Sequence, residues 1–211
     1  MEREALKQLV KELVVAYMAG QKTQIPIGVS NRHLHLSETV FNVLFPDEDL
    51  KVMKWLKQPG EFAAKQTVRV IGDKGKIEQV RILGPFRPAT QLEISKTDAR
   101  NIGVDAPIRM SGELIGTPGV TLQTDFGEVT LGCGVIVAKR HIHMPVVVAK
   151  NLGVTQGEEV AVQIRAGERS LIFQDCAIRV SDDFELEMHI DVDEANAADV
   201  GEGTFATIVE I

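Results

Sequence analysis

The chain of 211 residues repeats part of its own sequence. The segment NRHLHLS (31–37) resembles KRHIHMP (139–145), and each copy follows an apolar run. Further along, QLEIS (91–95) resembles EMHID (187–191). Two matched pairs of segments in the same order indicate an internal duplication. We therefore expect two similar structural units of roughly 100 residues each.

Beyond residue 25, short runs of β-branched or alternating residues are separated by turns that contain glycine or proline. Many short strands, spaced by about 8–12 residues, are typical of barrels or sandwiches rather than of a parallel α/β sheet. The predicted strands span 67–71, 76–83, 120–124, 128–131, 135–138, 159–164, 170–178, 185–190 and 204–211. Short helices are predicted at 37–45, 97–102 and 145–152.

Residues 1–19 have apolar side chains at steps of three and four, and Gly20 follows as a stop signal. This pattern predicts one amphipathic helix, joined to the rest by a short polar linker. Two interpretations remain open. The helix packs on the body of the protein, or it is a detachable targeting or docking helix.

Charge and cysteine content exclude several classes of protein. The net charge of −7 argues against a general nucleic-acid partner, which usually meets a basic surface. No stretch approaches the ~20 uninterrupted apolar residues of a membrane-spanning helix, so no membrane association is expected. Two distant cysteines, Cys133 and Cys176, cannot form a disulfide scaffold and fit a reducing cytoplasm.

Four of the five histidines form two H-x-H pairs, whereas chance predicts about 0.1 such pairs. In a strand, residues i and i+2 point to the same face, so both imidazoles can approach one ion. The repeat supplies a third donor at matching positions, and three donors leave a position open for water or substrate. We predict two metal sites, and zinc suits imidazole ligands. The sites are His33, His35 and Glu93, and His141, His143 and His189. The alternative is that these histidines are structural hydrogen-bonding groups at strand ends.

Several basic residues are candidate anion-binding groups. Arg87 lies between prolines in the stiff segment 84–90, close to Glu93, where its planar fork would clamp a phosphate or an oxyanion. The alternative is a loop arginine that faces solvent. Arg32 and Arg140 precede the two H-x-H pairs, and strand alternation turns them to the opposite face, so we expect structural ion pairs. A basic turn around Trp55, at 51–57, either grips a nucleotide phosphate or is simply solvated.

The segments 25–37, 84–87 and 140–144 resemble the PduL-type phosphate propanoyltransferases, the phosphotransacylases of propanediol-utilising microcompartments. The resemblance covers residues 25–211. It implies a mainly β fold of two small β-barrel domains, related by duplication and capped by short helices. The implied domains are 32–139, and 25–31 together with 140–211. Residues 1–24 would then form an N-terminal helix and linker that can serve as an encapsulation peptide.

The resemblance also implies the reaction, in which a short-chain acyl-CoA and phosphate interconvert with an acyl phosphate and CoA. Propanoyl-CoA and acetyl-CoA differ by one methylene, and the sequence does not choose between them. The family's two zinc-class ions fall on the two histidine clusters, and its essential arginine falls on Arg87. Its CoA contacts fall on Ser30, Lys54, Arg81 and Asn196. Other implied features are a cytoplasmic or microcompartment location and contacts of residues 1–19 with the microcompartment shell or core enzymes. We also expect a homo-oligomer.

Two other functions remain open at this point. One is a metal-dependent hydrolase of esters, thioesters or phosphoesters, and the other is a non-catalytic binding module stabilised by zinc. Within the transferase reading, direct attack by phosphate competes with a covalent acyl-enzyme formed on Cys133, which lies between two glycines close to the second H-x-H pair.

Overall fold

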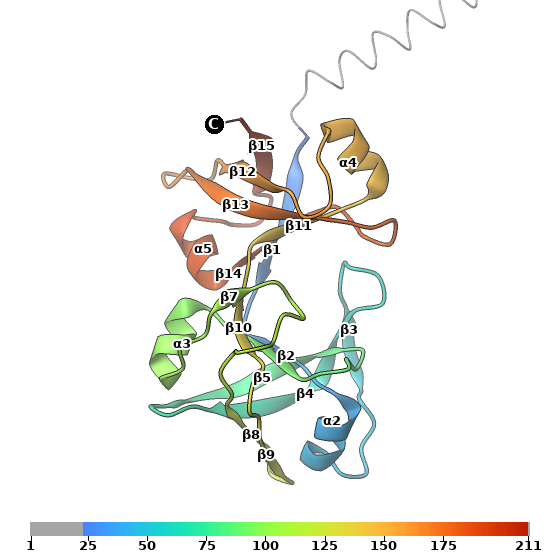
Figure 1. The fold of residues 1–211 in the computed structure, drawn as a ribbon, viewed down its shortest axis with the longest axis vertical. Helices are drawn as coiled ribbons and strands as arrows, with labels where there is room; N and C mark the ends of the chain where they lie inside the picture. Colours follow the sequence, from blue (N-terminus) through green and yellow to red (C-terminus); the bar gives the residue numbers. More distant parts are fainter. Residues whose placement is uncertain (1–22, 211) are drawn as a thin grey trace, which may run out of the picture.

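The computed structural model describes residues 23–210 of the chain. The predicted helix over 1–19 lies outside the described residues. Within 23–210, none of the helices has the length and apolar character needed to cross a lipid bilayer. Fifteen strands and four short helices make up this part of the chain, and Figure 1 shows them in two stacked halves. The prediction of a mainly β fold is confirmed.

The C-terminal half is a closed six-stranded barrel, in the order β1-β14-β11-β13-β12-β15. Strand β1 pairs parallel with β14 and antiparallel with β15, which closes the barrel. Residues 25–30 therefore pair with strands more than 100 residues away, and the chain then crosses into the other half. The strands are β1 (Ile25–Ser30), β11 (His141–Met144), β12 (Glu159–Ile164), β13 (Leu171–Val180), β14 (Glu187–Asp191) and β15 (Phe205–Val209).

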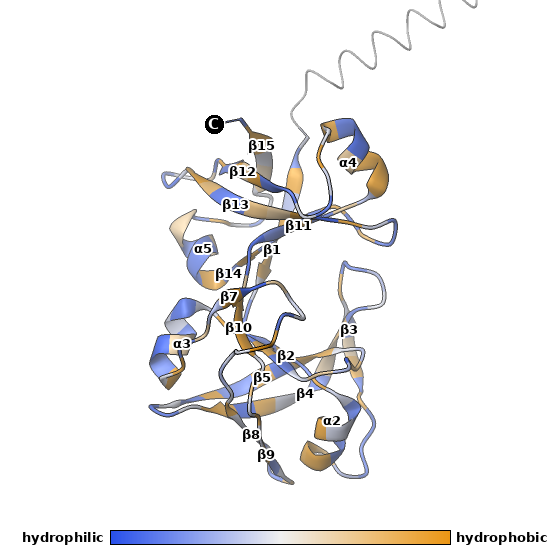
Figure 2. Cartoon of the chain, in the orientation of Figure 1, coloured by the Kyte–Doolittle hydropathy of each residue, from blue (hydrophilic) through white to orange (hydrophobic). Residues whose placement is uncertain are grey.

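The N-terminal half is a nine-stranded sheet that stays open as a half-barrel, in the order β7-β10-β6-β2-β5-β4-β8-β9 with β3 beside β4. Its strands are β2 (His33–His35), β3 (Val52–Trp55), β4 (Phe62–Ile71), β5 (Lys76–Gly84), β6 (Gln91–Glu93), β7 (Ile108–Arg109), β8 (Thr121–Gln123), β9 (Glu128–Thr130) and β10 (Val135–Ala138). Polar and apolar residues alternate along β4 between 67 and 70 (Figure 2), and the apolar ones, Val68 and Val70, are buried. This is the period that a strand with one buried face requires.

Four short helices cap the sheets: α2 (Glu38–Leu44), α3 (Lys96–Ile102), α4 (Val146–Leu152) and α5 (Val192–Ala197). The Ser95 hydroxyl accepts the N–H of Asp98 at 3.1 Å and begins α3. Gly103 and Gly153 end α3 and α4 in the left-handed conformation, as glycine allows. Helix α5 was not predicted, although it begins with a capping box between Asp191 and Glu194.

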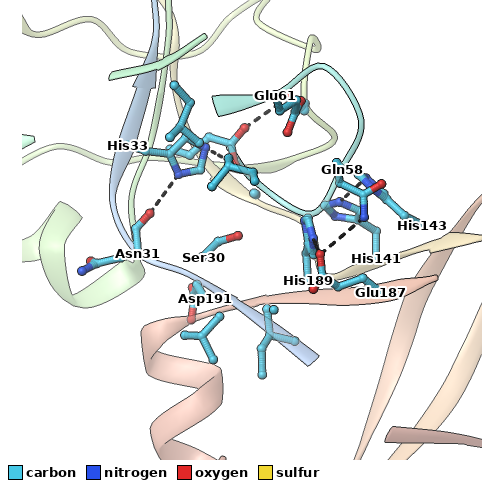
Figure 3. Close-up of a pocket in the computed structure, with 18 of the residues that line it drawn as sticks. Ser30, Asn31, His33, Gln58, Glu61, His141, His143, Glu187, His189 and Asp191 are labelled. Carbon is cyan, nitrogen blue, oxygen red and sulfur yellow. Dashed lines mark hydrogen bonds and ion pairs between the residues drawn. The ribbon is translucent and has the colours of Figure 1, made fainter. Parts of the chain in front are cut away.

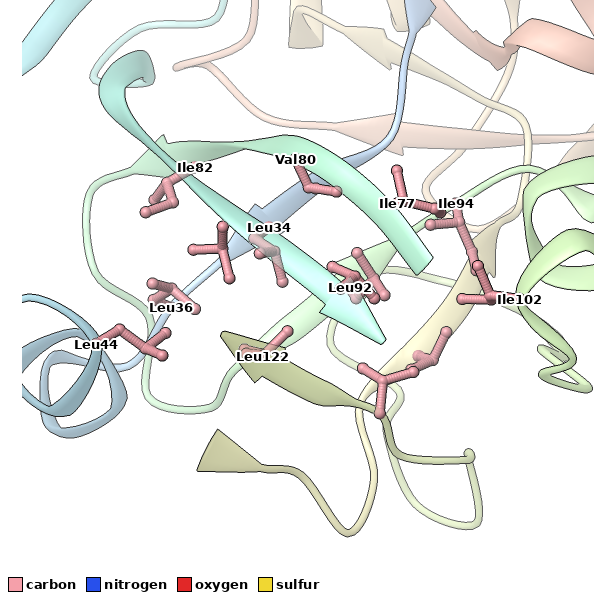
Figure 4. Packing of buried hydrophobic residues seen from close by; sticks show 14 of the residues in the cluster. Leu34, Leu36, Leu44, Ile77, Val80, Ile82, Leu92, Ile94, Ile102 and Leu122 are labelled. Atoms are coloured by element: carbon pink, nitrogen blue, oxygen red, sulfur yellow. The ribbon is translucent and has the colours of Figure 1, made fainter. Parts of the chain in front are cut away.

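Each half buries its own aliphatic core. Side chains from β2, β5, β6 and β8 meet inside the half-barrel, where Leu34, Ile82, Leu92 and Leu122 are fully buried (Figure 4). A second cluster fills the closed barrel and includes Ile142, which is also fully buried. The histidine strands β2 and β11 contribute apolar residues to these cores between their histidines. Packing of those residues therefore fixes the direction in which the imidazoles point.

The two halves repeat one strand arrangement around the H-x-H pairs. Strand β2 lies between β5, which is parallel to it, and β6, which is antiparallel. Strand β11 lies in the same way between β13 and β14. In this register His33 lies opposite Glu93, and His141 lies opposite His189.

The predicted ion pairs of Arg32 and Arg140 are confirmed, and the two pairs occupy equivalent places in the repeat. Arg32 Nη1 lies 2.7 Å from Asp98 Oδ1, and Arg140 Nε lies 2.6 Å from Glu194 Oε1. Each arginine thus ties the turn before a histidine strand to a short helix of its own half. These arginines hold the scaffold of the site.

Candidate functional site

One cavity of about 390 Å³ lies between the two halves, and the side chains of both histidine clusters line it. The half-barrel contributes one group of donors, and the closed barrel contributes the other (Figure 3). Arg87 also lines the cavity, and so does Arg179, which sequence reasoning missed. The structure therefore brings all six predicted metal ligands and the predicted anion clamp to the wall of a single cavity.

In the first cluster, the donor atoms of His33, His35 and Glu93 lie within 4.8 Å of one another. His33 Nδ1 donates to the carbonyl oxygen of Asn31 at 2.9 Å, which leaves a lone pair on Nε2. That Nε2 lies 3.4 Å from Glu93 Oε2, and His35 Nε2 lies 4.0 Å from Glu93 Oε1. The Asn31 carbonyl fixes the His33 ring through Nδ1, and this orients Nε2 toward the other donors, as in many metal-binding histidines.

In the second cluster, the donor atoms of His141, His143 and His189 also lie within 4.8 Å of one another. His141 Nδ1 donates to the carbonyl oxygen of Lys139 at 2.8 Å, the counterpart of the His33 contact. The Nε2 atoms of His141 and His143 lie 3.1 Å apart. The His141 contact leaves its Nε2 without a proton, and Arg179 Nη1 lies within donating distance of His143 Nε2, at 3.2 Å. Two lone pairs thus converge in a buried place.

The protonation of the imidazoles fits a metal site. Burial, with a smaller contribution from nearby positive groups, lowers the pKa of His35 to about 3. Burial likewise lowers the pKa of His141 to about 4 and that of His143 to about 2. These rings are therefore neutral near pH 7, which is the form that binds a metal ion.

Glu93 carries the negative charge of the first cluster. Burial pushes its pKa upward, but the neighbouring imidazoles and the Arg87 guanidinium outweigh burial and hold the pKa below its usual value. The carboxylate is therefore ionised. The buried Nδ1 atoms of His35 and His143 have no hydrogen-bond partner among residues 23–210. Buried neutral imidazoles with converging lone pairs, together with one carboxylate, form a donor set that fits divalent zinc-class ions.

Two guanidinium groups form the anion-binding side of the cavity. Arg87 Nη1 donates to Ser111 Oγ at 2.8 Å, and Arg87 Nη2 lies 3.4 Å from Glu61 Oε1. Arg179 has no carboxylate partner in an ion pair among the described residues, and its guanidinium lies over the ring of Phe184. Burial lowers the pKa of Arg179, and the charge of Arg87 lowers it further. Two guanidinium groups on the wall of one cavity, of which only Arg87 forms an ion pair among the described residues, can bind an anion together.

The predicted CoA contacts divide into two pairs. Ser30 and Arg81 line the cavity, and Arg81 Nη1 also donates to the carbonyl oxygens of Ala64 and Lys65. Lys54 lies exposed on β3, and Asn196 lies exposed on α5; neither lines the cavity.

The two cysteines lie away from the cavity wall. Cys133 is exposed in the turn before β10, and Cys176 is buried in the core of the barrel. Burial raises the pKa of the Cys176 thiol to about 12. Neither thiol is placed to attack a substrate bound between the two clusters.

Sequence reasoning did not select Arg179 or Glu187 as site residues. Arg179 belongs to no motif, and Glu187 lies in the repeated segment 187–191, where only His189 was chosen as a donor. Arg179 reaches the cavity because β13 pairs parallel with β11, which places it opposite His143. Glu187 lies opposite His143 on the other neighbouring strand. The only signal available was the duplication, which aligns Glu187 with Gln91 two residues before the third donor of each cluster.

Converging neutral imidazoles beside two arginines define a candidate metal centre for an anionic substrate. Comparison with known proteins gives the family. The profile of the family described as phosphate propanoyltransferase matches residues 26–201. A phosphate propanoyltransferase of Levilactobacillus brevis is 51% identical over 210 residues, which cover 100% of both chains. One of Shewanella putrefaciens is 53% identical, covering 96% of this chain and 95% of its own, and one of Salmonella typhimurium is 50% identical, covering 94% and 93%.

The chain belongs to the phosphate propanoyltransferase family, and it is an acyltransferase. The resemblance drawn from the duplicated histidine motifs is therefore confirmed.

Proposed function

We propose that this enzyme interconverts a short-chain acyl-CoA and phosphate with an acyl phosphate and CoA, and that it does so at a site for two metal ions. The observation that carries the proposal is the convergence of both donor clusters and both arginines on one cavity. If the histidines were only structural hydrogen-bonding groups, nothing would require the Arg87 and Arg179 side chains to line the same cavity.

The first ion would be held by His33, His35 and Glu93, and the second by His141, His143 and His189. When bound, divalent ions supply Lewis acidity, which polarises a carbonyl and stabilises charge on oxygen or on a thiolate. Zinc is the ion that these donors suit best.

Arg87 and Arg179 bind phosphate and compensate part of its charge. Contacts with Ser111 and Glu61 orient the Arg87 guanidinium before the substrate arrives. A phosphate oxygen then attacks the thioester carbonyl, the new carbon–oxygen bond forms, and the carbon–sulfur bond breaks with the electron pair leaving on the CoA sulfur. Positioning and charge stabilisation carry this reaction without a nucleophile from the protein.

We propose that the acyl end of acyl-CoA lies inside the cavity and that the rest of CoA extends out of it. Ser30 and Arg81 are the proposed contacts inside the cavity, and Lys54 and Asn196 those outside it. Acetyl and propanoyl groups differ by one methylene, worth ~1–3 kcal/mol in an apolar pocket. Comparing kcat/KM for the two thioesters gives the preference.

The test is a thiol-release assay on zinc-loaded protein, with and without inorganic phosphate. The proposal predicts release of free CoA that depends on phosphate, with an equal amount of acyl phosphate formed. Removal of the metal with a chelator should abolish release, and added zinc should restore it. Release at the same rate without phosphate would overturn phosphate as the acyl acceptor and indicate hydrolysis, and no release from any short-chain acyl-CoA would overturn the proposed substrate class.

We also propose that residues 1–19 direct the enzyme into a bacterial microcompartment in the cytoplasm. The support is their amphipathic pattern and the membership of the chain in this family. Deletion of residues 1–19, followed by localisation of the tagged protein in cells that form microcompartments, tests this. Unchanged localisation would contradict it.

A further inference from the structure

Residues 56–61 connect β3 to β4, and a tight turn at 58–61 forms the tip of this loop. The N–H of Glu61 donates to the carbonyl oxygen of Gln58 at 3.2 Å, which closes the turn. Pro59 stands second and Gly60 third, with a φ of +80° at Gly60, as in a type II turn. Proline presets φ at its position, so the turn holds its two end residues at a fixed separation. The side chains of those two residues, Gln58 and Glu61, both line the cavity (Figure 3).

The first residue of the turn, Gln58, binds the closed barrel. Its side chain is buried, and its Nε2 donates to the carbonyl oxygen of Glu185 at 3.1 Å. Its Oε1 accepts the backbone N–H of the same residue at 3.3 Å. A side-chain amide carries a donor and an acceptor side by side, which allows it to pair with both backbone groups of Glu185. Next to it, Lys57 Nζ donates to the carbonyl oxygen of Leu186 at 3.0 Å.

Each end of the turn adjoins one of the two arginines of the cavity. On the half-barrel side, Glu61 Oε1 lies 3.4 Å from Arg87 Nη2. On the side of the closed barrel, Glu185 follows Phe184 in the chain, and the guanidinium carbon of Arg179 lies 5.5 Å from the centre of the Phe184 ring. A series of contacts therefore runs from Arg87 through the turn to Arg179.

The two halves are also joined at places away from this turn. The chain crosses between them at 30–33 and at 138–141, and the Thr97 N–H donates to Asp193 Oδ2 at 2.9 Å, between α3 and α5. In Figure 1, α3 and α5 lie on one side of the molecule and the loop after β3 lies on the other. The turn thus restrains the two halves on the side opposite the helices. Because Arg87 and Arg179 belong to different halves, a tilt of one half would change the separation of their guanidinium groups.

We propose that Gln58 is a positioning residue for phosphate binding. By attaching the turn at 58–61 to the closed barrel, it sets the separation of the Arg87 and Arg179 guanidinium groups. Two such groups bind one phosphate well only when both reach its oxygens at once. The donor clusters do not depend on this separation, since the ligands of each cluster come from one half. This inference rests on the proposed function, in which both arginines bind phosphate.

The first test compares two buried glutamines that make the same kind of contact. Gln66 Nε2 donates to the carbonyl oxygen of Asp49 at 2.8 Å and its Oε1 accepts the N–H of Lys51 at 3.1 Å, but both partners belong to its own half. In the thiol-release assay, Gln58→Leu should lower kcat/KM for phosphate by about 10–100-fold. The matched control, Gln66→Leu, should keep the wild-type value. Both variants should bind as much zinc as the wild type. An equal fall in both variants, or loss of zinc from Gln58→Leu alone, would overturn the inference.

The second test examines whether the effect passes through the pair of arginines. In an Arg179→Ala background, Gln58→Leu should lower kcat/KM for phosphate much less than it does in the wild type, because no separation of two guanidinium groups is left to set. An undiminished fall would overturn the inference. Gln58→Asn keeps the amide on a side chain that is one methylene shorter, so it should show the same effects in weaker form. It takes the place of Gln58→Leu if that variant does not fold.

The spacing of the two halves can be measured without any turnover. Spin labels on cysteines introduced at Asn42 of α2 and at Asn151 of α4, both exposed, report this spacing in a Cys133→Ser background. In double electron–electron resonance, Gln58→Leu should shift or broaden the distribution of distances between the labels, and Gln66→Leu should not. An unchanged distribution in Gln58→Leu would count against a positioning role and overturn the inference.

The outcomes separate this inference from the proposed function. If the wild-type chain releases thiol in a phosphate-dependent manner and Gln58→Leu keeps its kcat/KM for phosphate, the inference is wrong and the proposed function stands. If the wild-type chain shows no dependence on phosphate, both are overturned.

Discussion

Replacing Arg87 by alanine is the sharpest test of how the cavity works. Arg87 is one of two guanidinium groups facing the proposed phosphate position, and Arg179 remains in the variant. Loss of one preorganised donor that stabilises developing charge typically costs ~10²–10³ in kcat, or ~2.7–4 kcal/mol. We therefore expect kcat of Arg87→Ala to fall by about that factor rather than to vanish.

The fold and the metal content should survive this change. The Arg87 N–H donates to the carbonyl oxygen of Leu36 at 2.9 Å, and alanine keeps that contact. The ion pair with Glu61 is 3.4 Å long, and both side chains are about one-third exposed. Pairs of this kind contribute at most about 1 kcal/mol to stability. Arg87 supplies no atom to either donor cluster, so the variant should bind as much zinc as the wild type.

The assay is steady-state thiol release at saturating acyl-CoA with varied phosphate, on protein whose zinc content has been measured. Arg109→Ala is the matched control, since Arg109 is exposed on β7 and does not line the cavity. It should keep wild-type kcat. If fully zinc-loaded Arg87→Ala loses less than tenfold in kcat, Arg87 is not the phosphate clamp and the reasoning from the cavity fails.

Three further outcomes follow. Iodoacetamide at pH 8 should label Cys133 and leave Cys176 unmodified in the native protein, as mass spectrometry would show, because a thiol with a pKa of about 12 stays protonated there. Cys133→Ala should keep turnover within a few-fold of the wild type, and complete loss would revive the covalent route. Ile142→Ala should lower the free energy of unfolding by about 2–5 kcal/mol in a denaturant titration, since Ile142 is fully buried between two histidines; a change below 1 kcal/mol would contradict close packing there.

Local patterns in the sequence were enough for much of the site. The H-x-H spacing places two imidazoles on one face because strand side chains alternate with period 2. The repeat aligned Glu93 with His189, and the strand register places each opposite the first histidine of its pair. The same repeat aligned Asp98 with Glu194, the ion-pair partners of the two arginines, although sequence reasoning named no partner.

Other features depend on pairings between distant strands. Nothing local shows that β13 pairs parallel with β11, yet that pairing alone brings Arg179 to the cavity. Strand β3 and helix α5 were missed, since an exposed four-residue strand and a six-residue helix leave little periodicity to detect.

The sequence by itself determined which residue types recur and on which face of each strand they lie. The reason is local, because successive side chains of a strand point to opposite faces. Local patterns did not place residues 25–31 with the C-terminal half, which only the family resemblance implied. Only the tertiary structure decided how β1 pairs to close that barrel, and that the loop at 56–61 reaches across to Glu187. Those contacts come from burying two aliphatic cores side by side, and the packing energy of a core is shared among residues far apart in the chain.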